Sequence, residues 1–242
     1  GTLIPAGTPD PPVFECVECP APTGEPCIGV RGNPIKTLHP ARHAAADAAP
    51  RVLSVADTDT ARGLLGTLAA ERLTGHVEEG PFTRDMERGV MAEPFAQDAY
   101  TERTGHTVVN VGFIVRDFGG YRIGLSPDGL VGDDGLTEWK APRAKGHINT
   151  VLADEVPAHH MAQLQTALLV SGRSWIDFVS FHGGLPLYIK RVHPDPAWFS
   201  AIKAAAQAAE DAITDITTRY EAAVKGLPLT ERIPDPYAEI TV

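Results

Sequence analysis

Residues 126–140, with the sequence SPDGLVGDDGLTEWK, predict a β-hairpin that decides the fold. A Gly-Asp-Asp-Gly turn separates two short runs, and Gly and Asp both tolerate the positive φ angles that hairpin turns require. Side chains alternate along a strand, so Glu138 and Lys140 share one face while Trp139 points to the other. The hairpin therefore presents an acidic and a basic side chain together, close to Asp128 on the first strand.

The length of the hairpin loop decides which residue lies opposite Asp128. With a two-residue loop, the cross-strand partner of Asp128 is Trp139, and Glu138 and Lys140 lie on either side of that position. With a three-residue loop, Asp128 lies directly opposite Glu138. In either register, two carboxylates and an ammonium group converge on one place.

This combination of side chains has a chemical interpretation. Two carboxylates a few ångströms apart repel each other unless a cation lies between them or one of them binds a proton. Oxygen ligands with few competing donors favour Mg²⁺ or Mn²⁺. A neighbouring lysine can polarise a water molecule or a phosphate oxygen, which suits phosphodiester hydrolysis. The spacing Asp-x9-Glu-x-Lys is loose, and an exposed hairpin with solvated charges is the alternative.

Three further blocks accompany the hairpin: MERGVMAEPFAQDAY (86–100), PAHHMAQLQTALLVSG (157–172) and RSWIDFVSF (173–181). In this order, the four blocks resemble the lambda exonuclease and YqaJ-like viral recombinase family of the PD-(D/E)XK nuclease superfamily. The resemblance covers about residues 52–224. It implies a mixed α/β (α+β) fold, with a restriction-endonuclease-like core and flanking helices.

The resemblance also implies a role for each matching residue. Asp128 and Glu138 would be metal ligands, and the backbone carbonyl of Trp139 would be a third. Lys140 would position or activate the water nucleophile. Glu93, on the preceding helix, would complete the acidic site.

Two of the candidate site residues have structural alternatives. Because Glu93 precedes Pro94, it could instead lie near a helix start. Gln163 and Gln165 are two positions apart and cannot share a helix face, so at most one of them faces the site. The family match favours Gln163 as the residue that touches the site or the DNA.

The candidate DNA contacts are Ser126, Arg62, Arg143 and Lys145. By resemblance, Ser126 matches a serine that helps to hold a 5′ phosphate. Arg62 and Ser54 are the nearest equivalents of the arginine and serine that complete this pocket. The basic cluster from Lys140 to His147 could line the DNA path or form a solvated loop. His159 and His160 are interpreted as surface or DNA-proximal residues, because adjacent helical side chains point in different directions.

The first fifty residues contain a pattern typical of zinc sites. Its potential ligands are Cys16, Cys19, Cys27 and His39. A Cys-x2-Cys pair followed by a third cysteine and a histidine fits tetrahedral zinc. The pattern resembles Cys-Cys-Cys-His zinc knuckles of actinobacterial and actinophage proteins, where His-x-x-Arg recurs, and this match favours His39 over His43. The alternative is free cysteines in an unfolded arm, although a segment this poor in apolar residues needs such a staple to fold.

Hydrophobic spacing predicts the remaining elements. The helices are expected at 60–73, 84–104, 157–172 and 195–224, and the strands outside the hairpin at 107–116, 121–125, 175–181 and 187–192. The expected organisation is a zinc-knuckle segment over 1–50, a nuclease domain over 51–226 and a C-terminal tail over 227–242.

Composition sets outer limits on function. The chain has 242 residues, 43% of them hydrophobic, which suits one substantial core. It has neither an apolar run that could span a membrane nor a signal-peptide pattern, so a cytoplasmic location in a bacterial or phage-infected cell is expected. The net charge of −10 argues against a protein that binds nucleic acid over its whole surface, although a local groove can still be positive.

These observations lead to one principal hypothesis and two alternatives. The principal hypothesis is a DNA exonuclease that uses two Mg²⁺ or Mn²⁺ ions and acts from duplex ends, 5′ to 3′, in phage-type recombination. The resemblance further implies a phage single-strand annealing protein as partner and a homotrimer. The alternatives are a structure-specific or single-strand endonuclease on the same core, and a DNA- or protein-binding module whose nuclease core is inactive.

Overall fold

The computed structural model describes residues 6–7, 14–48, 52–55, 58–77, 80 and 82–231. The expected boundary between residues 50 and 51 lies outside this part of the chain, as do residues 232–242 of the expected tail.

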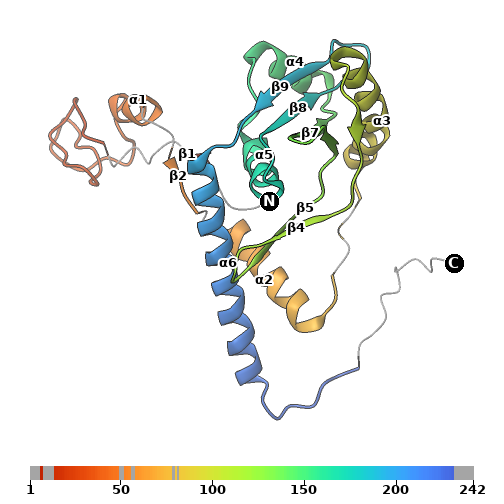
Figure 1. The fold of residues 1–242 in the computed structure, drawn as a ribbon. Helices are drawn as coiled ribbons and strands as arrows, with labels where there is room; N and C mark the ends of the chain where they lie inside the picture. Colours follow the sequence, from red (N-terminus) through yellow and green to blue (C-terminus); the bar gives the residue numbers. More distant parts are fainter. Residues whose placement is uncertain are drawn as a thin grey trace.

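A five-stranded sheet forms the centre of the main body of the structure (Figure 1). In spatial order its strands are β3 (Val108–Val109), β6 (Gly129–Val131), β7 (Gly135–Lys140), β8 (Trp175–Ser180) and β9 (Tyr188–Val192). β7 and β8 are parallel, and every other neighbouring pair is antiparallel. All six residues of β8 are buried, and four of them are apolar, as expected for a strand covered on both faces. The mixed α/β fold expected from the sequence is confirmed.

Two helices cover opposite faces of this sheet. Helix α5 (Ala158–Ser171) packs through Leu164 and Leu168 against the even-numbered side chains of β7 and β8, including Phe178. Helix α3 (Arg84–Thr104) packs through Tyr100 on the face formed by the odd-numbered side chains. The alternation of side chains along β7 therefore directs Glu138 and Lys140 toward α5, and Trp139 toward α3.

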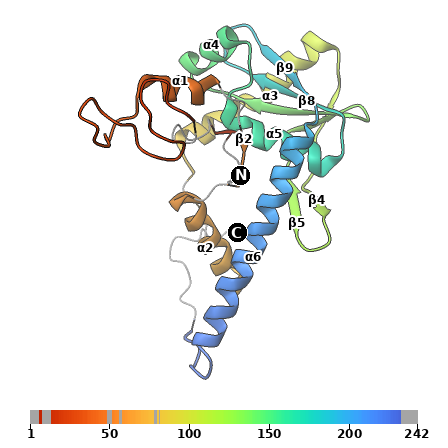
Figure 2. The ribbon, with the colours of Figure 1, turned by 90° about the vertical axis from the view of Figure 1, so that its left-hand side faces the viewer.

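A second structural unit extends away from the sheet. Helix α6 (Pro196–Ala223) is the longest helix described, and α2 (Asp59–Thr74) packs along it (Figures 1 and 2). Arg72 on α2 donates to Glu210 on α6 over 2.6 Å and joins the two helices. The N-cap of α2 is Thr58 and its C-cap is Gly75, whose φ of 64° is accessible to glycine at little cost.

The prediction of a single strand over residues 107–116 is wrong, because this segment contains two strands that belong to different sheets. β3 pairs with β6, whereas β4 (Ile114–Asp117) pairs with β5 (Arg122–Leu125) in a separate two-stranded hairpin. Residues 110–113 lie between the two strands and belong to neither.

Two helices were not expected from the sequence. α4 (Ala144–Ala153) follows β7 and occupies the segment interpreted as a basic cluster or loop. α1 (Pro40–Ala48) follows the last proposed zinc ligand. The described residues contain no helix of the length and apolarity that a membrane span requires.

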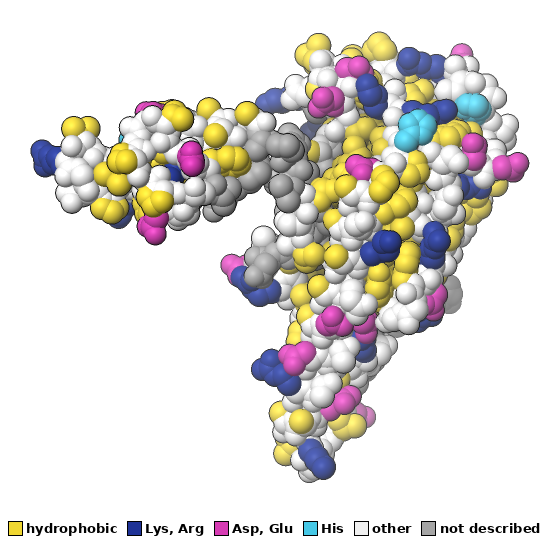
Figure 3. Space-filling model, turned by 60° about the vertical axis from the view of Figure 1, so that its left-hand side comes forward, with side chains coloured by type: hydrophobic (Ala, Val, Ile, Leu, Met, Phe, Trp, Pro, Cys, Tyr) yellow, Lys and Arg dark blue, Asp and Glu magenta, His cyan; other side chains and the backbone are white. Residues whose placement is uncertain are grey.

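The N-terminal segment forms an arm beside the main body, and acidic and basic side chains are interspersed on the face shown in Figure 3. A short antiparallel pair, β1 (Ala6–Gly7) and β2 (Val52–Leu53), lies where the arm meets the body. Leu53 packs with Trp198 and Ile202 of α6. The arm is therefore attached to the body next to the start of the longest helix.

Candidate active site and zinc cluster

The acidic hairpin adopts the register with the three-residue loop. Gly129 lies opposite Thr137, and Val131 lies opposite Gly135, so residues 132–134 form the loop. Gly132 has a φ of 53°, in the left-handed region that glycine reaches at little cost. This register places Asp128, which directly precedes β6, beside Glu138. The carboxylate of Asp128 accepts a hydrogen bond of 2.7 Å from the backbone N–H of Trp139.

Glu138 lies at the centre of the candidate site. It is 2% exposed, and its Oε1 atom is the acceptor for two side chains. Lys140 Nζ donates to this oxygen over 2.5 Å, and Gln163 Nε2 donates to it over 2.7 Å. The hairpin and α5 therefore hold Glu138 from two directions.

Burial raises the pKa of all three acidic groups of the site, and the charge of Asp128 adds to this shift for Glu138 and Glu93. Burial raises the pKa of Glu138 to about 7, and the charge of Asp128 adds to the shift while Lys140 opposes it. Burial also raises the pKa of Asp128, although the N–H of Trp139 opposes this. The pKa of Glu93 on α3 is raised by burial and then by Asp128. The site holds more negative charge than its own cations balance.

The donor set fits a hard divalent cation. Hydrogen bonds within the described residues occupy Glu138 Oε1 and Asp128 Oδ2 and leave the second oxygen of each carboxylate without a partner. A cation between these oxygens would stabilise the charged form of both carboxylates, which burial disfavours, and would offset the repulsion of Glu138 by Asp128. The carboxylates do not form a closed ligand group, because the cysteine cluster is the sole set of three or more such ligand atoms gathered within 4.8 Å in the described chain.

The two glutamines of α5 have different environments. Gln163 contacts Glu138, as described above. Gln165 is buried, and it donates to the carbonyl of His193 and accepts from the N–H of Asp195, both over 2.9 Å. These two bonds tie α5 to the start of α6, so Gln165 has a structural role.

The candidate DNA contacts do not all lie together. Ser126 is exposed just before the hairpin, and Lys145 is exposed on α4. Arg143 is exposed and pairs with Asp85 of α3 over 3.1 Å. Arg62 lies on α2, where it pairs with Asp59 over 2.7 Å.

The remaining member of the basic cluster requires a correction. His147 is 1% exposed and makes ring hydrogen bonds with the hydroxyl of Ser180 (2.8 Å) and the carbonyl of Pro186 (3.0 Å). It braces α4 against the end of β8 and cannot line a DNA path.

Sequence reasoning missed a cleft beside the hairpin. The cleft has a volume of about 1390 Å³, and its lining includes Lys140 and His160. His160 is half-buried and packs against Phe178, with ring centroids 5.4 Å apart, so it is not a simple surface residue. A usable signal existed: His160 precedes Gln163 by three positions, which places both on one face of α5.

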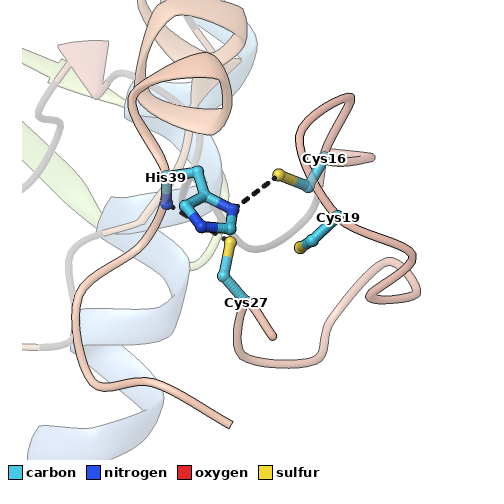
Figure 4. Close-up of side chains that lie close together, drawn as sticks. All are labelled: Cys16, Cys19, Cys27 and His39. Carbon is cyan, nitrogen blue, oxygen red and sulfur yellow. Dashed lines mark hydrogen bonds between the residues drawn. The ribbon is translucent and has the colours of Figure 1, made fainter. Parts of the chain in front are cut away.

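The N-terminal arm brings together the four predicted zinc ligands (Figure 4). The ligand atoms of Cys16, Cys19, Cys27 and His39 all lie within 4.8 Å of one another. Cys16 Sγ lies 3.4 Å from His39 Nδ1. The N–H of Ile28 lowers the pKa of the Cys19 thiol to about 6, which favours the thiolate form that metals bind. The histidine in this group is His39 and not His43.

A buried arginine supports the cluster. Arg42 of α1 is fully buried and donates to the backbone carbonyls of Ala21 (3.0 Å), Pro22 (2.9 Å) and Glu25. It thereby holds the loop between Cys19 and Cys27 against α1. This contact explains the arginine of the His-x-x-Arg motif.

Two known protein families match the chain, one over the central sheet region and one over the N-terminal arm. The model of the YqaJ-like viral recombinase domain matches residues 41–174, and that of a phage zinc finger domain matches residues 4–58. No curated protein matches.

Solved structures with this fold include an alkaline exonuclease from Laribacter hongkongensis. It is 30% identical, has a TM-score of 0.65, and the match covers 72% of this chain and 89% of that chain. Its complex with dAMP matches at 31% identity and a TM-score of 0.65, over 71% of this chain and 89% of that chain.

A phage related exonuclease from Haemophilus somnus 129PT shares the fold at 16% identity, with a TM-score of 0.55 and coverage of 67% and 85%. The predicted family is confirmed: the chain belongs to the YqaJ-like viral recombinase domain family, and it carries a phage zinc-finger-like segment at its N-terminus.

Proposed function

We propose that the protein is a Mg²⁺-dependent DNA exonuclease that removes nucleotides from duplex ends, 5′ to 3′, in phage-type recombination. The observation that carries the proposal is the contact of Lys140 and Gln163 with buried Glu138, next to Asp128. The relative from Laribacter hongkongensis is described as an alkaline exonuclease, and its structure with dAMP holds a mononucleotide, the kind of product that an exonuclease releases.

The proposed metal site uses Asp128, Glu138 and the backbone carbonyl of Trp139, with Glu93 completing it from α3. Two bound Mg²⁺ or Mn²⁺ ions would stabilise the charge that develops on the attacking and leaving oxygens. The chain's own contribution is orientation, because the hydrogen bond from Gln163 fixes one oxygen of Glu138 and leaves the other available.

Lys140 has a separate role in the proposal. Its side chain is 27% exposed, contacts Glu138 and also lines the cleft. It can therefore donate a hydrogen bond to a water molecule or to a phosphate oxygen at the site. This cation also offsets part of the negative charge that a phosphate would meet there.

We assign the DNA contacts by position. Ser126 lies two residues before Asp128, which suits contact with the phosphate near the reacting bond. Arg143 and Lys145 extend from the end of β7 along α4 and would contact the backbone of the duplex. Arg62 and Ser54 remain the proposed partners of Ser126 in binding a 5′ phosphate.

We propose that the cysteine cluster binds one structural Zn²⁺ ion through Cys16, Cys19, Cys27 and His39. The description of the matching phage zinc finger family names DNA binding as a proposed role, so the arm is assigned to DNA or to a partner protein. The division into segments 1–50, 51–226 and 227–242, a homotrimeric assembly and an annealing protein as partner belong to the same proposal.

Digestion of defined DNA substrates tests this function. The full chain should release mononucleotides from linear duplex in Mg²⁺ and leave a covalently closed circle intact. A label at the 5′ end of a strand should be released before a label at its 3′ end. Rapid cutting of the circle would favour the endonuclease instead. Failure to cut any DNA with Mg²⁺ or Mn²⁺, together with DNA binding that is lost in Cys16→Ser, would favour the binding module.

A further inference from the structure

Unlike the other acidic groups of the proposed site, Glu93 lies on a separate helix, α3. Glu93, Ala96 and Tyr100 are spaced by three and four residues, so they share one face of this helix. Ala96 and Tyr100 are buried in one cluster with Trp139 of β7. The same face therefore directs Glu93 toward the hairpin.

The part of α3 that carries Glu93 has little packing to hold it. The two buried residues of the helix, Ala96 and Tyr100, both follow Pro94. Pro94 has no backbone N–H, so the carbonyl of Val90 cannot receive the usual helical hydrogen bond from this position. Glu93 therefore lies at the junction between a packed half of the helix and an exposed half, and the exposed half needs its own attachment to the sheet.

Arg88 provides this attachment. Its Nη2 atom donates to the carbonyl of Ala141 over 3.2 Å, and its Nη1 atom donates to Asp85 Oδ1 over 2.5 Å. Ala141 directly follows Lys140 in the chain. Arg143 donates to the same oxygen of Asp85 over 3.1 Å. Two arginines and one aspartate thus tie the start of α3 to the segment that leaves β7.

This segment is itself held in place on the sheet. The carbonyl of Lys140 accepts from the N–H of Phe181 over 2.8 Å, and the ring of His182 hydrogen-bonds to the carbonyl of Pro142 over 3.0 Å. These two bonds lie on either side of the carbonyl that accepts from α3. The start of α3 is therefore joined to a fixed point at the end of β7.

Stability alone does not account for the group formed by Asp85, Arg88 and Arg143. The side chains of Asp85 and Arg88 are 56% and 39% exposed, and exposed ion pairs stabilise a fold only slightly. At the other end of α3, Arg103 donates to the carbonyl of Leu187 and attaches the packed half of the helix. What distinguishes Arg88 is its place, because its bond joins the helix of Glu93 to the strand end beside Lys140.

We propose that Arg88, oriented by Asp85, is a positioning residue that fixes Glu93 relative to Asp128 and Lys140 for hydrolysis. The inference rests on the proposed nuclease function and adds a residue that acts through Glu93 without contacting the DNA. A displacement of about 1 Å at a reacting group can slow an enzyme by about 10²-fold, so a single hydrogen bond at this point can have a large effect on rate.

The test is a double-mutant cycle, measured by single-turnover digestion of linear duplex by the full zinc-loaded chain in saturating Mg²⁺. Arg88→Met should slow digestion by roughly tenfold or more. In the Glu93→Gln background, which is itself slow, the same change should alter the rate by less than about twofold, because the residue that Arg88 positions has already lost its function.

Arg103→Met is the matched control, because it removes the other bond between an arginine of α3 and a carbonyl group. It should stay within about twofold of its parent rate in both backgrounds. Melting curves give a readout that does not depend on activity. Mg²⁺ should raise the melting temperature of Arg103→Met as much as that of the wild type, and that of Arg88→Met by less.

The wild-type rate in folded Arg88→Met would overturn the positioning role. Equal losses from Arg88→Met in both backgrounds, an equal effect of Mg²⁺ on the melting of Arg88→Met and Arg103→Met, or the wild-type rate in Glu93→Gln would also overturn it. These results would leave the nuclease proposal intact, because the wild type would still digest duplex.

If Arg88→Met does not fold, Asp85→Ala decides the test, because it leaves Arg88 in place but removes the group that orients it. This variant should slow digestion in the wild-type background and not in the Glu93→Gln background, and equal losses in both would overturn the positioning role. Absence of Mg²⁺-dependent digestion by the wild type would overturn the nuclease proposal and the positioning role together.

Discussion

Lys140 Nζ lies 2.5 Å from Glu138 Oε1, so the cation of the site is in contact with its most buried carboxylate. Because Lys140 offsets its charge, the carboxylate of Glu138 can be buried on β7, between β6 and β8. It also gives Lys140 two partners, Glu138 on one side and the cleft on the other.

Replacement of Lys140 tests this dual position. Lys140→Met should reduce the rate of duplex digestion by roughly 10²–10⁴-fold, because the donor to the water or phosphate is lost while the bulk of the side chain is kept. Single-turnover digestion measures the effect. Lys203→Met, at an exposed position on α6, is the matched control and should retain the wild-type rate. Equal rates in Lys140→Met and the control would remove Lys140 from the mechanism.

The two glutamines of α5 should respond differently to substitution. Gln163→Ala removes a contact with Glu138 and should lower the digestion rate with little change in stability. Gln165→Ala leaves the N–H of half-buried Asp195 without its acceptor and should cost about 1–3 kcal/mol of unfolding free energy. Urea unfolding and digestion rates measured on both variants separate these effects. The assignment fails if Gln163→Ala unfolds as readily as Gln165→Ala.

The raised pKa of Glu138 predicts a pH-dependent stability. Burial raises this pKa from 4.5 to about 7, so the folded state holds the proton more tightly than the unfolded state. As pH rises from about 4.5 through 7, this residue lowers the unfolding free energy, by about 3 kcal/mol in total. In metal-free buffer, Glu138→Gln should therefore gain stability relative to the wild type at pH 8 but not at pH 5.

Urea unfolding followed by tryptophan fluorescence measures this difference, because Trp139, Trp175 and Trp198 all lie in the nuclease region. A variant that is less stable than the wild type by the same amount at both pH values would contradict the predicted charge burial. Mg²⁺ should raise the melting temperature of the wild type and leave that of Glu138→Gln nearly unchanged.

A buried hydrogen bond should stabilise the helix that carries Glu93. The hydroxyl of Tyr100 on α3 donates to buried Asp177 of β8 over 2.8 Å, and Arg191 donates to the same carboxylate. Tyr100→Phe should lower the unfolding free energy by about 1.5–3 kcal/mol, because the bond is made to a charged group. Tyr220→Phe, at an exposed position on α6, provides the control. Equal stability of the two variants would show that the bond contributes little.

The zinc assignment predicts a specific pair of results for two histidines. His39→Ala should lose bound zinc and become sensitive to protease between residues 14 and 48, while the nuclease region keeps its melting temperature. His43→Ala should retain zinc, because His43 lies outside the ligand group. Zinc content per chain, measured after gel filtration, checks both. Full zinc content in His39→Ala would contradict the assignment.

The sequence was sufficient for elements whose signals are local. Helices α2 and α3 end at Gly75 and Gly105, which adopt left-handed φ angles of 64° and 71°, and both C-termini were expected. Pro94 does not start a helix but lies inside α3, so Glu93 is in mid-helix. Helix α4 was not predicted, because it lacks the usual sequence signals of a helix start. Its N-cap, Arg143, makes no side-chain capping bond, and its first turn has no acidic residue.

Features that depend on distant segments could not be predicted. Alternation along 107–116 is the same whether its residues pair with β6 or with β5, so the sequence did not reveal the break between β3 and β4. The proximity of Asp128 and Glu138 followed from the hairpin pattern, but the loop length that fixes their register did not. The cleft needs walls from α4, β9 and α6, and for this reason His160 was missed.

The most direct test of the central claim is digestion of linear duplex in Mg²⁺ by Asp128→Asn. This change keeps a side-chain oxygen that can accept the N–H of Trp139 but removes the charge that a metal ion needs. We expect normal folding and duplex binding, and mononucleotide release at least about 10²-fold slower than in the wild type. Release at the wild-type rate by the folded variant would show that the hairpin of residues 126–140 is not the hydrolytic site.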